Sequence, residues 1–150
     1  MTQNDKQQLL LKVLSTMLPY GVILKTPQGD GYLNEVSLSI FSHKLGINIK
    51  ATERTYFKLE ECKPYLRPML SMTEEEEKEI LRFKNSMSFI HDLECLFINQ
   101  AYKHDIAFPH YYDYFVRLED WLNKHHFDYR GLIPMGLAIE VTKENNPYKN

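Results

Sequence analysis

The sequence of 150 residues contains few cysteines and no long apolar segment. It carries two thiols, Cys62 and Cys95, whereas small secreted domains generally have several cysteines in a disulfide framework. The N-terminal segment lacks the basic start and the cleavage site of a signal peptide, and no stretch approaches the ~20 apolar residues that span a membrane. We therefore expect a cytoplasmic protein with reduced thiols, and a single disulfide between the two cysteines stays open as an alternative.

A dominant charge of one sign is also missing. The chain has 18 Lys and Arg against 20 Asp and Glu, which gives a formal net charge of −2. This balance creates no long-range attraction to phosphate backbones or anionic lipid, so we expect protein partners and no membrane, with nucleic acid not favoured. An apolar fraction of 43% and an aromatic fraction of 13% are typical of a folded domain and exclude a disordered chain.

Motifs of known chemistry are missing as well. The six histidines contain no pair at the i,i+4 spacing of a helical zinc site, and the six scattered glycines form no phosphate-binding loop. Cys62 follows two glutamates, which raise a thiol pKa rather than lower it. We expect no catalytic residue, cofactor or metal ion. Because His91-Asp92 is the dipeptide of metal phosphohydrolases, a metal-dependent hydrolase that uses His91, Asp92 and His104 remains the third alternative.

The N-terminal part of the chain combines one helix with a small sheet. Apolar residues at helical spacing predict an amphipathic helix over 6–18, capped by Asn4 or Asp5 and ended by Pro19. From about 20 to 60, short alternating apolar runs are separated by turn residues, which predicts a small antiparallel sheet or an SH3-like partial barrel. The segment 62–72 contains Pro64 and Pro68 and is predicted to be a connector.

The C-terminal part is predicted to be mainly helical. Thr73 and Glu76 fit a capping box at the start of one helix, and Pro109 suits the first turn of another that ends near Gly131. The segment 137–141 is a short strand or a last helical turn, and the polar tail 142–150 is expected to be loose. Apolar stripes on these helices are expected to be buried: Ile80, Phe83, Met87 and Ile90 on the first, and Tyr111, Phe115, Leu118 and Leu122 on the second.

These elements predict an α+β fold in a single domain over 1–150. Residues 1–62 would supply the N-terminal helix and the sheet, and residues 63–150 would supply the helical part with its polar tail. The sequence shows no internal repeat.

Two stretches, at 63–68 and 125–131, combine aromatic rings, a guanidinium group and a constrained backbone. Because Tyr and Arg are enriched at interfaces, they are candidates for an interaction surface; an Arg beside aromatic rings could also hold single-stranded nucleic acid. Alternatively, the two arginines anchor loops through backbone carbonyls or a carboxylate such as Asp128, with both tyrosines at least half buried. The candidate residues are Tyr65, Arg67, His125, His126, Tyr129 and Arg130.

The same stretches carry a resemblance. The runs KPYLRPMLSMTEEEEKE, DWLNKHHFDYRGLIPMGLAIEV and TKENNPYK, with LPYGV at 18–22, resemble an uncharacterised family of small proteins found in phages and prophages of gut anaerobic bacteria. The resemblance implies a mobile-element accessory protein and brings no activity, cofactor or catalytic residue. We expect a non-enzymatic accessory or protein-interaction protein; the alternative is a nucleic-acid-associated module that uses the small sheet and the Arg67 or Arg130 region.

Overall fold

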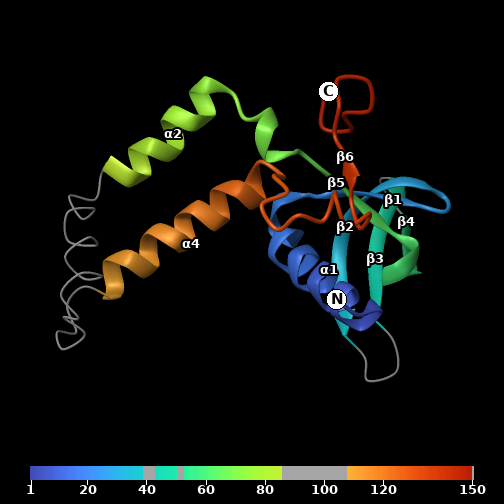
Figure 1. Ribbon diagram of the computed structural model, residues 1–150. Helices are drawn as coiled ribbons and strands as arrows, with labels where there is room; N and C mark the ends of the chain where they lie inside the picture. Colours follow the sequence, from blue (N-terminus) through green and yellow to red (C-terminus); the bar gives the residue numbers. More distant parts are fainter. Residues whose placement is uncertain (39–42, 51–52, 86–107, 150) are drawn as a thin grey trace. The chain divides into compact units, whose positions relative to one another are not determined.

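The computed structural model describes residues 1–38, 43–50, 53–85 and 108–149 (Figure 1). They form an α+β fold with an N-terminal helix, a six-stranded mixed sheet and later helices, as the sequence predicts. The helices are α1 (Gln3–Met17), α2 (Glu74–Asn85) and α4 (Phe108–Lys124). The strands are β1 (Ile23–Thr26), β2 (Gly29–Leu38), β3 (His43–Lys50), β4 (Glu53–Lys58), β5 (Lys63–Leu66) and β6 (Ile139–Glu140).

The described residues divide into two compact units. One contains 1–70 together with 123–150, and the other contains 71–122. The first unit holds α1 and the whole sheet, and the second holds α2 and most of α4. Residues 86–107, which include Met87, Ile90, His91, Asp92, Cys95 and His104, lie outside the described part of the chain.

Helix α1 begins earlier than the sequence analysis placed it, because Thr2 is its N-cap rather than Asn4 or Asp5. Asp5 instead completes a capping box: the Thr2 N–H donates to Asp5 Oδ2 at 2.7 Å, and the Asp5 N–H donates to Thr2 Oγ1 at 3.2 Å. The helix ends in a short 3-10 turn that contains Pro19, and Gly21 follows with a φ of 66°. Its buried face consists of Leu10, Leu11, Val13, Leu14 and Met17.

The sheet has the order β4-β3-β2-β1-β5-β6, in which neighbouring strands are antiparallel except for the parallel pair of β5 with β6. It is an open sheet rather than a closed barrel. Helix α1 covers one face, which we call the inner face (Figure 1). Inner-face side chains pack with α1 in one core because alternate strand residues point to the same side: they include Leu24, Leu33, Leu45, Ile47 and Phe57.

Strand β5 corrects the prediction that residues 62–72 only connect other elements. Lys63–Leu66 lies between β1 and β6, with Pro64 opposite Leu24. A proline inside a sheet normally argues against a central strand, because it lacks the N–H that the ladder needs. Beside Pro64 the Tyr148 hydroxyl joins the strands instead, accepting from the Ile23 N–H at 3.2 Å and donating to the Tyr65 carbonyl at 2.8 Å.

The polar tail is ordered through residue 149, contrary to the expectation of a loose end. Thr142 and Asn145 form a turn in which the Thr142 N–H donates to Asn145 Oδ1 at 2.6 Å, and the Asn145 amide donates to the Glu140 carbonyl at 2.9 Å. Tyr148 then packs on Ile23 and Tyr65. The segment 137–141 contains the short strand β6, one of the two structures predicted for it.

In the second unit, the capping box at the start of α2 is confirmed. The Thr73 N–H donates to Glu76 Oε2 at 2.9 Å, and the Glu76 N–H donates to Thr73 Oγ1 at 3.3 Å. On α4, Phe115 is 46% exposed, so the expected burial of this residue is wrong. The residue that terminates helix α4 is His126 rather than Gly131. His126 has a φ of 57°, in the left-handed region, and its N–H donates to the Asn123 carbonyl at 3.1 Å.

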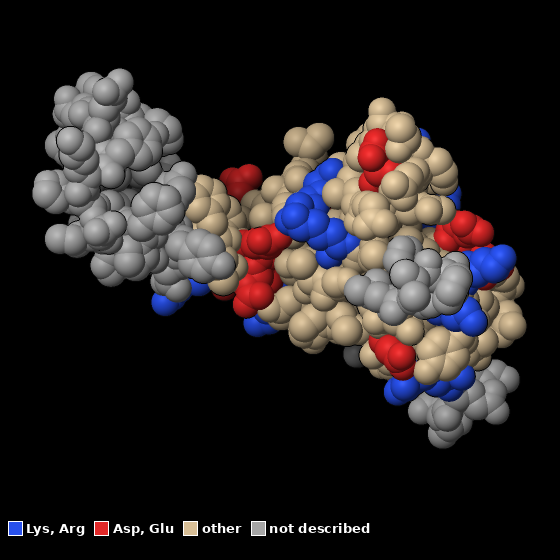
Figure 2. Space-filling view, turned by 90° about the horizontal axis from the view of Figure 1, so that it is seen from below, with Lys and Arg blue, Asp and Glu red and all other residues tan. Residues whose placement is uncertain are grey.

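None of the described helices is long and apolar enough to cross a membrane. The surface carries charges of both signs. Figure 2 shows small groups of Lys and Arg interspersed with Asp and Glu on the face it presents, without a wide area of one sign. On this face, therefore, the positive and negative charges that balance in the composition are also mixed in space.

Candidate functional site

The two candidate stretches, distant in sequence, lie side by side through backbone pairing. Arg67 and Phe127 form a parallel bridge, in which the Arg67 N–H donates to the His126 carbonyl and the Asp128 N–H donates to the Arg67 carbonyl, both at 2.8 Å. The guanidinium carbon of Arg67 lies 4.2 Å from the centroid of the Phe127 ring. This contact is a cation–π interaction, so Arg67 is part of the junction between the two stretches.

Both tyrosines of the candidate set are more than half buried, as predicted. Tyr65 is 7% exposed, and its hydroxyl lies 3.2 Å from both carboxylate oxygens of Asp30. Burial is the main reason that the pKa of Tyr65 is raised, with the Asp30 charge adding to it. Tyr129 donates to Asn123 Oδ1 at 3.1 Å, and Arg130 lies over its ring at 5.1 Å. Neither tyrosine presents its ring to solvent as an open contact residue.

Asp128 anchors the loop that follows it through the backbone. Its two carboxylate oxygens accept hydrogen bonds from the N–H groups of Leu132 and Ile133, at 2.7 and 2.8 Å. The sequence suggested Asp128 only as one partner for Arg67 or Arg130 in anchoring a loop. The buried carboxylate of Asp128 also holds the loop directly, because an ionised acceptor makes strong bonds to backbone donors.

His125 and His126 are neighbours in sequence, and both are partly buried. His126 Nε2 lies 2.9 Å from the Tyr20 carbonyl, and its ring stacks on Tyr148 with centroids 4.0 Å apart and planes 7° apart. Burial lowers the pKa of His126, and the nearby His125 and Arg67 act in the same direction. The candidate set thus joins the loop, the tail and the sheet, and its use as an interaction surface stays a prediction.

Two further findings concern metal binding and thiol chemistry in the described residues. Within 1–38, 43–50, 53–85 and 108–149, no group of three His, Cys, Asp or Glu residues could hold a metal ion. Cys62 is buried, and burial together with the Glu61 charge raises the pKa of its thiol to about 12. Cys62 is therefore protonated at neutral pH and is no nucleophile.

A further candidate site, not identified from the sequence, is the side of β2, β3 and β4 opposite α1, which we call the outer face. A bulge between Leu33 and Glu35 shifts the register, so that Glu35 turns to the outer face while Leu33 stays in the core. Cross-strand partners lie on the same side of a sheet. From the register, the outer face carries Tyr32, Glu35, Ser37, Lys44, Asn48, Arg54, Tyr56 and Lys58.

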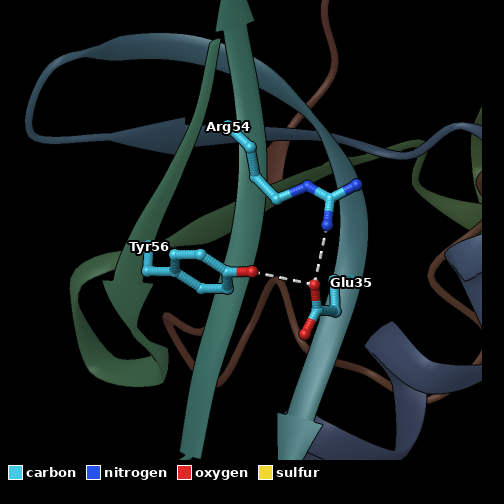
Figure 3. A network of polar contacts seen from close by, with 3 residues as sticks. All are labelled: Glu35, Arg54 and Tyr56. Carbon is cyan, nitrogen blue, oxygen red and sulfur yellow. Dashed lines mark hydrogen bonds and ion pairs between the residues drawn. The ribbon is translucent and has the colours of Figure 1, made fainter.

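A polar network fixes the centre of the outer face (Figure 3). The Tyr56 hydroxyl and Arg54 Nη1 both donate to Glu35 Oε2 at 3.0 Å, so that two residues of β4 reach across β3 to β2. The position they cross is Gly46, the cross-strand partner of both Glu35 and Tyr56. A Cβ there would lie 3.0 Å from Glu35 Cβ and 3.3 Å from both Arg54 Cδ and Tyr56 Cε1. Glycine leaves the space in which the network forms.

Two tyrosine rings on the outer face are open to solvent. Tyr32 is 53% exposed and Tyr56 is 50% exposed. Half-exposed tyrosine rings on a sheet are suited to contacts with another molecule, because a tyrosine side chain has only two rotatable bonds and loses little entropy on binding. One signal in the sequence could have found this site: Arg54, Tyr56 and Lys58 alternate with Thr55 and Phe57, the period of a strand with one polar face.

No family model matches the chain, and neither a curated protein nor a solved structure was found that is similar to it.

Proposed function

We propose that this chain is a non-enzymatic accessory protein that acts in the bacterial cytoplasm and binds a partner protein through the outer face of β2–β4. The observation that carries the proposal is the Glu35–Arg54–Tyr56 network, in which one carboxylate oxygen holds two side chains of the edge strand β4. Tyr32 and Tyr56 offer half-exposed rings on the same face. Tyr and Arg are the residue types enriched at the centres of protein interfaces.

The network favours binding because it prepares the surface in advance. A free Tyr or Arg side chain loses rotamer freedom when a partner immobilises it, which costs ~0.5–1.5 kcal/mol for each rotamer-rich side chain. The hydrogen bonds to Glu35 already restrict Arg54 and Tyr56 in the unbound protein. A partner would then lose less free energy in immobilising these side chains, because folding has already ordered them.

The phage or prophage setting rests on the resemblance of four sequence runs, which include LPYGV at 18–22 and TKENNPYK near the C-terminus. The buried, protonated Cys62 is consistent with a binding role.

A single-stranded nucleic acid is the second candidate partner. The half-exposed rings of Tyr32 and Tyr56 favour it, because bases stack on exposed aromatic side chains with little regard to sequence. The Glu35 carboxylate, which accepts from the Tyr56 hydroxyl, and the net charge of −2 weigh against it. Nucleic-acid binding would weaken steeply with salt, whereas a contact that relies on rings and hydrogen bonds would not.

The test is affinity capture from the native host with and without nuclease, using the wild type and the Tyr32→Ala/Tyr56→Ala double variant. Lys12→Ala, an exposed change on α1, is the matched control. A nuclease-resistant partner that the wild type and the control retain and the double variant loses would support the proposal. A partner retained equally by all three proteins would contradict it, and a partner lost on nuclease treatment would favour the nucleic-acid candidate.

A further inference from the structure

One end of the outer face carries an uncompensated pair of like charges. Lys44 on β3 and Lys58 on β4 are direct cross-strand partners, and both side chains are exposed. Like charges directly opposite each other destabilise a sheet. In the described part of the chain no carboxylate forms an ion pair with either lysine. Of the two acids that follow Lys58, Glu60 accepts from the Gln7 side-chain amide at 3.2 Å, and Glu61 accepts from the backbone N–H of Lys58 at 2.8 Å. The other cross-strand neighbour of Lys44 is Ser37, which is neutral.

A second lysine pair on the same sheet, which we call the compensated pair, has a carboxylate residue as a direct cross-strand neighbour. Lys25 on β1 faces Lys63 on β5, but its partner on the other side is Asp30 on β2. Neither pair forms an ion pair in the described part of the chain. The difference lies in the register: Lys25 has a carboxylate as a direct cross-strand neighbour, whereas the direct neighbours of Lys44 are Ser37 and Lys58. Arg54 is compensated too, because Glu35 binds it at 3.0 Å. Unbalanced positive charge on the outer face is thus concentrated at Lys44 and Lys58.

We infer that the outer face binds an acidic, extended segment of the partner protein, with carboxylates at Lys44 and Lys58 and apolar or planar side chains over Tyr56 and Tyr32. This inference rests on the proposed function and specifies its partner. Lys44 and Asn48, the β3 residue opposite Tyr32, are four positions apart, a length of ~13 Å at the ~3.3 Å rise of a strand. A segment of about five extended residues would cover the face.

The arrangement favours an acidic peptide over a nucleic-acid strand. A peptide can place its carboxylates at one end and neutral side chains elsewhere, which matches two lysines at one end and a network without net charge in the middle. A nucleic-acid strand carries a phosphate at every nucleotide and would set some of them near Glu35. The Glu35 carboxylate would repel these phosphates, while a peptide segment could offer it N–H donors.

The experiment compares charge inversion at the two lysine pairs. Lys58→Glu inverts the charge at the uncompensated pair, and Lys63→Glu makes the same change at the compensated pair as the matched control. Each protein is titrated with the acetylated and amidated peptide of sequence EEEAF, with its counterpart KKKAF, and with a short poly-dT oligonucleotide. Amide chemical shifts report both the affinity and the residues contacted.

We expect EEEAF to shift the amides of Lys44, Tyr56 and Lys58, and to bind the wild type and Lys63→Glu alike. Its affinity for Lys58→Glu should fall about tenfold, as expected for the loss and reversal of one close charge contact. Lys58→Glu should fold, because it converts a like-charge pair into an opposite-charge pair; Lys58→Gln serves if it does not.

Equal binding of EEEAF to wild type and Lys58→Glu, binding of KKKAF as tight as EEEAF, or tighter binding of poly-dT at the same residues would overturn the inference. The captured partner separates this result from a failure of the proposed function. If the Tyr32→Ala/Tyr56→Ala variant loses the partner and Lys58→Glu retains it, the binding face stands and its acidic ligand does not. If the Tyr double variant also retains the partner, both proposals fall.

Discussion

Tyr148, two residues from the C-terminus, stacks on His126 with ring centroids 4.0 Å apart. The Tyr148 hydroxyl also bridges β1 and β5 between Ile23 and Tyr65, and burial is the main reason that the pKa of Tyr148 is raised. One side chain thus ties the tail to the sheet and to the loop after α4. A buried hydroxyl that both accepts and donates is costly to remove, because its backbone partners lose their bonds with it.

Tyr148→Phe should therefore destabilise the protein while keeping the ring stack on His126. Losing two hydrogen bonds to backbone groups should lower the free energy of unfolding by about 1–3 kcal/mol. Urea unfolding followed by circular dichroism measures the change. Tyr148→Ala, which also removes the stack, should cost more than Tyr148→Phe; equal effects of the two variants would show that the hydroxyl bridge carries the whole contribution, and no effect of either would contradict the assigned role.

How much of this fold the sequence predicts depends on the range of the contacts involved. The capping box of Thr73 and Glu76 lies within four residues and was predicted correctly. Strand β5 was not, because Pro64 argues locally against a strand, while the hydroxyl that joins Tyr65 to β1 comes from a residue 83 positions away. A local pattern does not contain that contact, and the ordered tail was missed for the same reason.

The pH dependence of stability should contain a contribution from His126. Burial and the positive neighbours His125 and Arg67 hold the pKa of His126 below its ordinary value of 6.5, even though the Tyr20 carbonyl opposes them. As pH falls below 6.5, the unfolded chain binds this proton and the folded chain does not yet bind it. The unfolded state then carries more protons, so the free energy of unfolding falls with decreasing pH until the folded pKa is passed.

His126→Gln removes this contribution, since an amide can still donate to the Tyr20 carbonyl but does not titrate. We expect the difference in melting temperature between wild type and His126→Gln to change between pH 7.5 and about pH 5, with the wild type losing more. Thermal unfolding at several pH values measures it. A constant difference across this range would show that His126 titrates in the folded protein as it does in the unfolded chain.

Asp128→Ala should be among the more destabilising single changes in the first unit. It leaves the N–H groups of Leu132 and Ile133 without their acceptors, at a buried position. Bonds to a charged acceptor are stronger than neutral ones, so a loss of about 2–4 kcal/mol is expected. Asp128→Asn keeps one acceptor oxygen and should lie between the wild type and Asp128→Ala in urea unfolding; an effect of Asp128→Ala below about 0.5 kcal/mol, the usual range of surface changes, would contradict the anchoring role.

The candidate binding face was hidden in the sequence by a single bulge. Leu33 and Glu35 are two positions apart, and in a regular strand they would share a face. The shift between them separates the core residue from the network residue. Strand alternation around Arg54 and Tyr56 indicates one polar face. The meeting of these residues with Glu35 also depends on the bulge in β2, which shifts the register and which the pattern of β4 does not contain.

Gly46→Ala tests whether the network depends on the space above β3. The added Cβ would lie 3.0 Å from Glu35 Cβ and 3.3 Å from the Tyr56 ring, so the side chains that meet over β3 must move apart. We expect the free energy of unfolding to fall by about 1–3 kcal/mol, the usual cost of overpacking. The Tyr56 side chain should also become more mobile. Ser37→Ala, on the same face but outside the network, is the control and should change stability by less than about 0.5 kcal/mol. Side-chain relaxation of Tyr56 and urea unfolding provide the two readouts. Suppose that Gly46→Ala leaves both the stability and the rigidity of the Tyr56 ring unchanged. The hydrogen bonds to Glu35 would then form without the glycine, because the backbone of β3 would have moved to make room for the added Cβ.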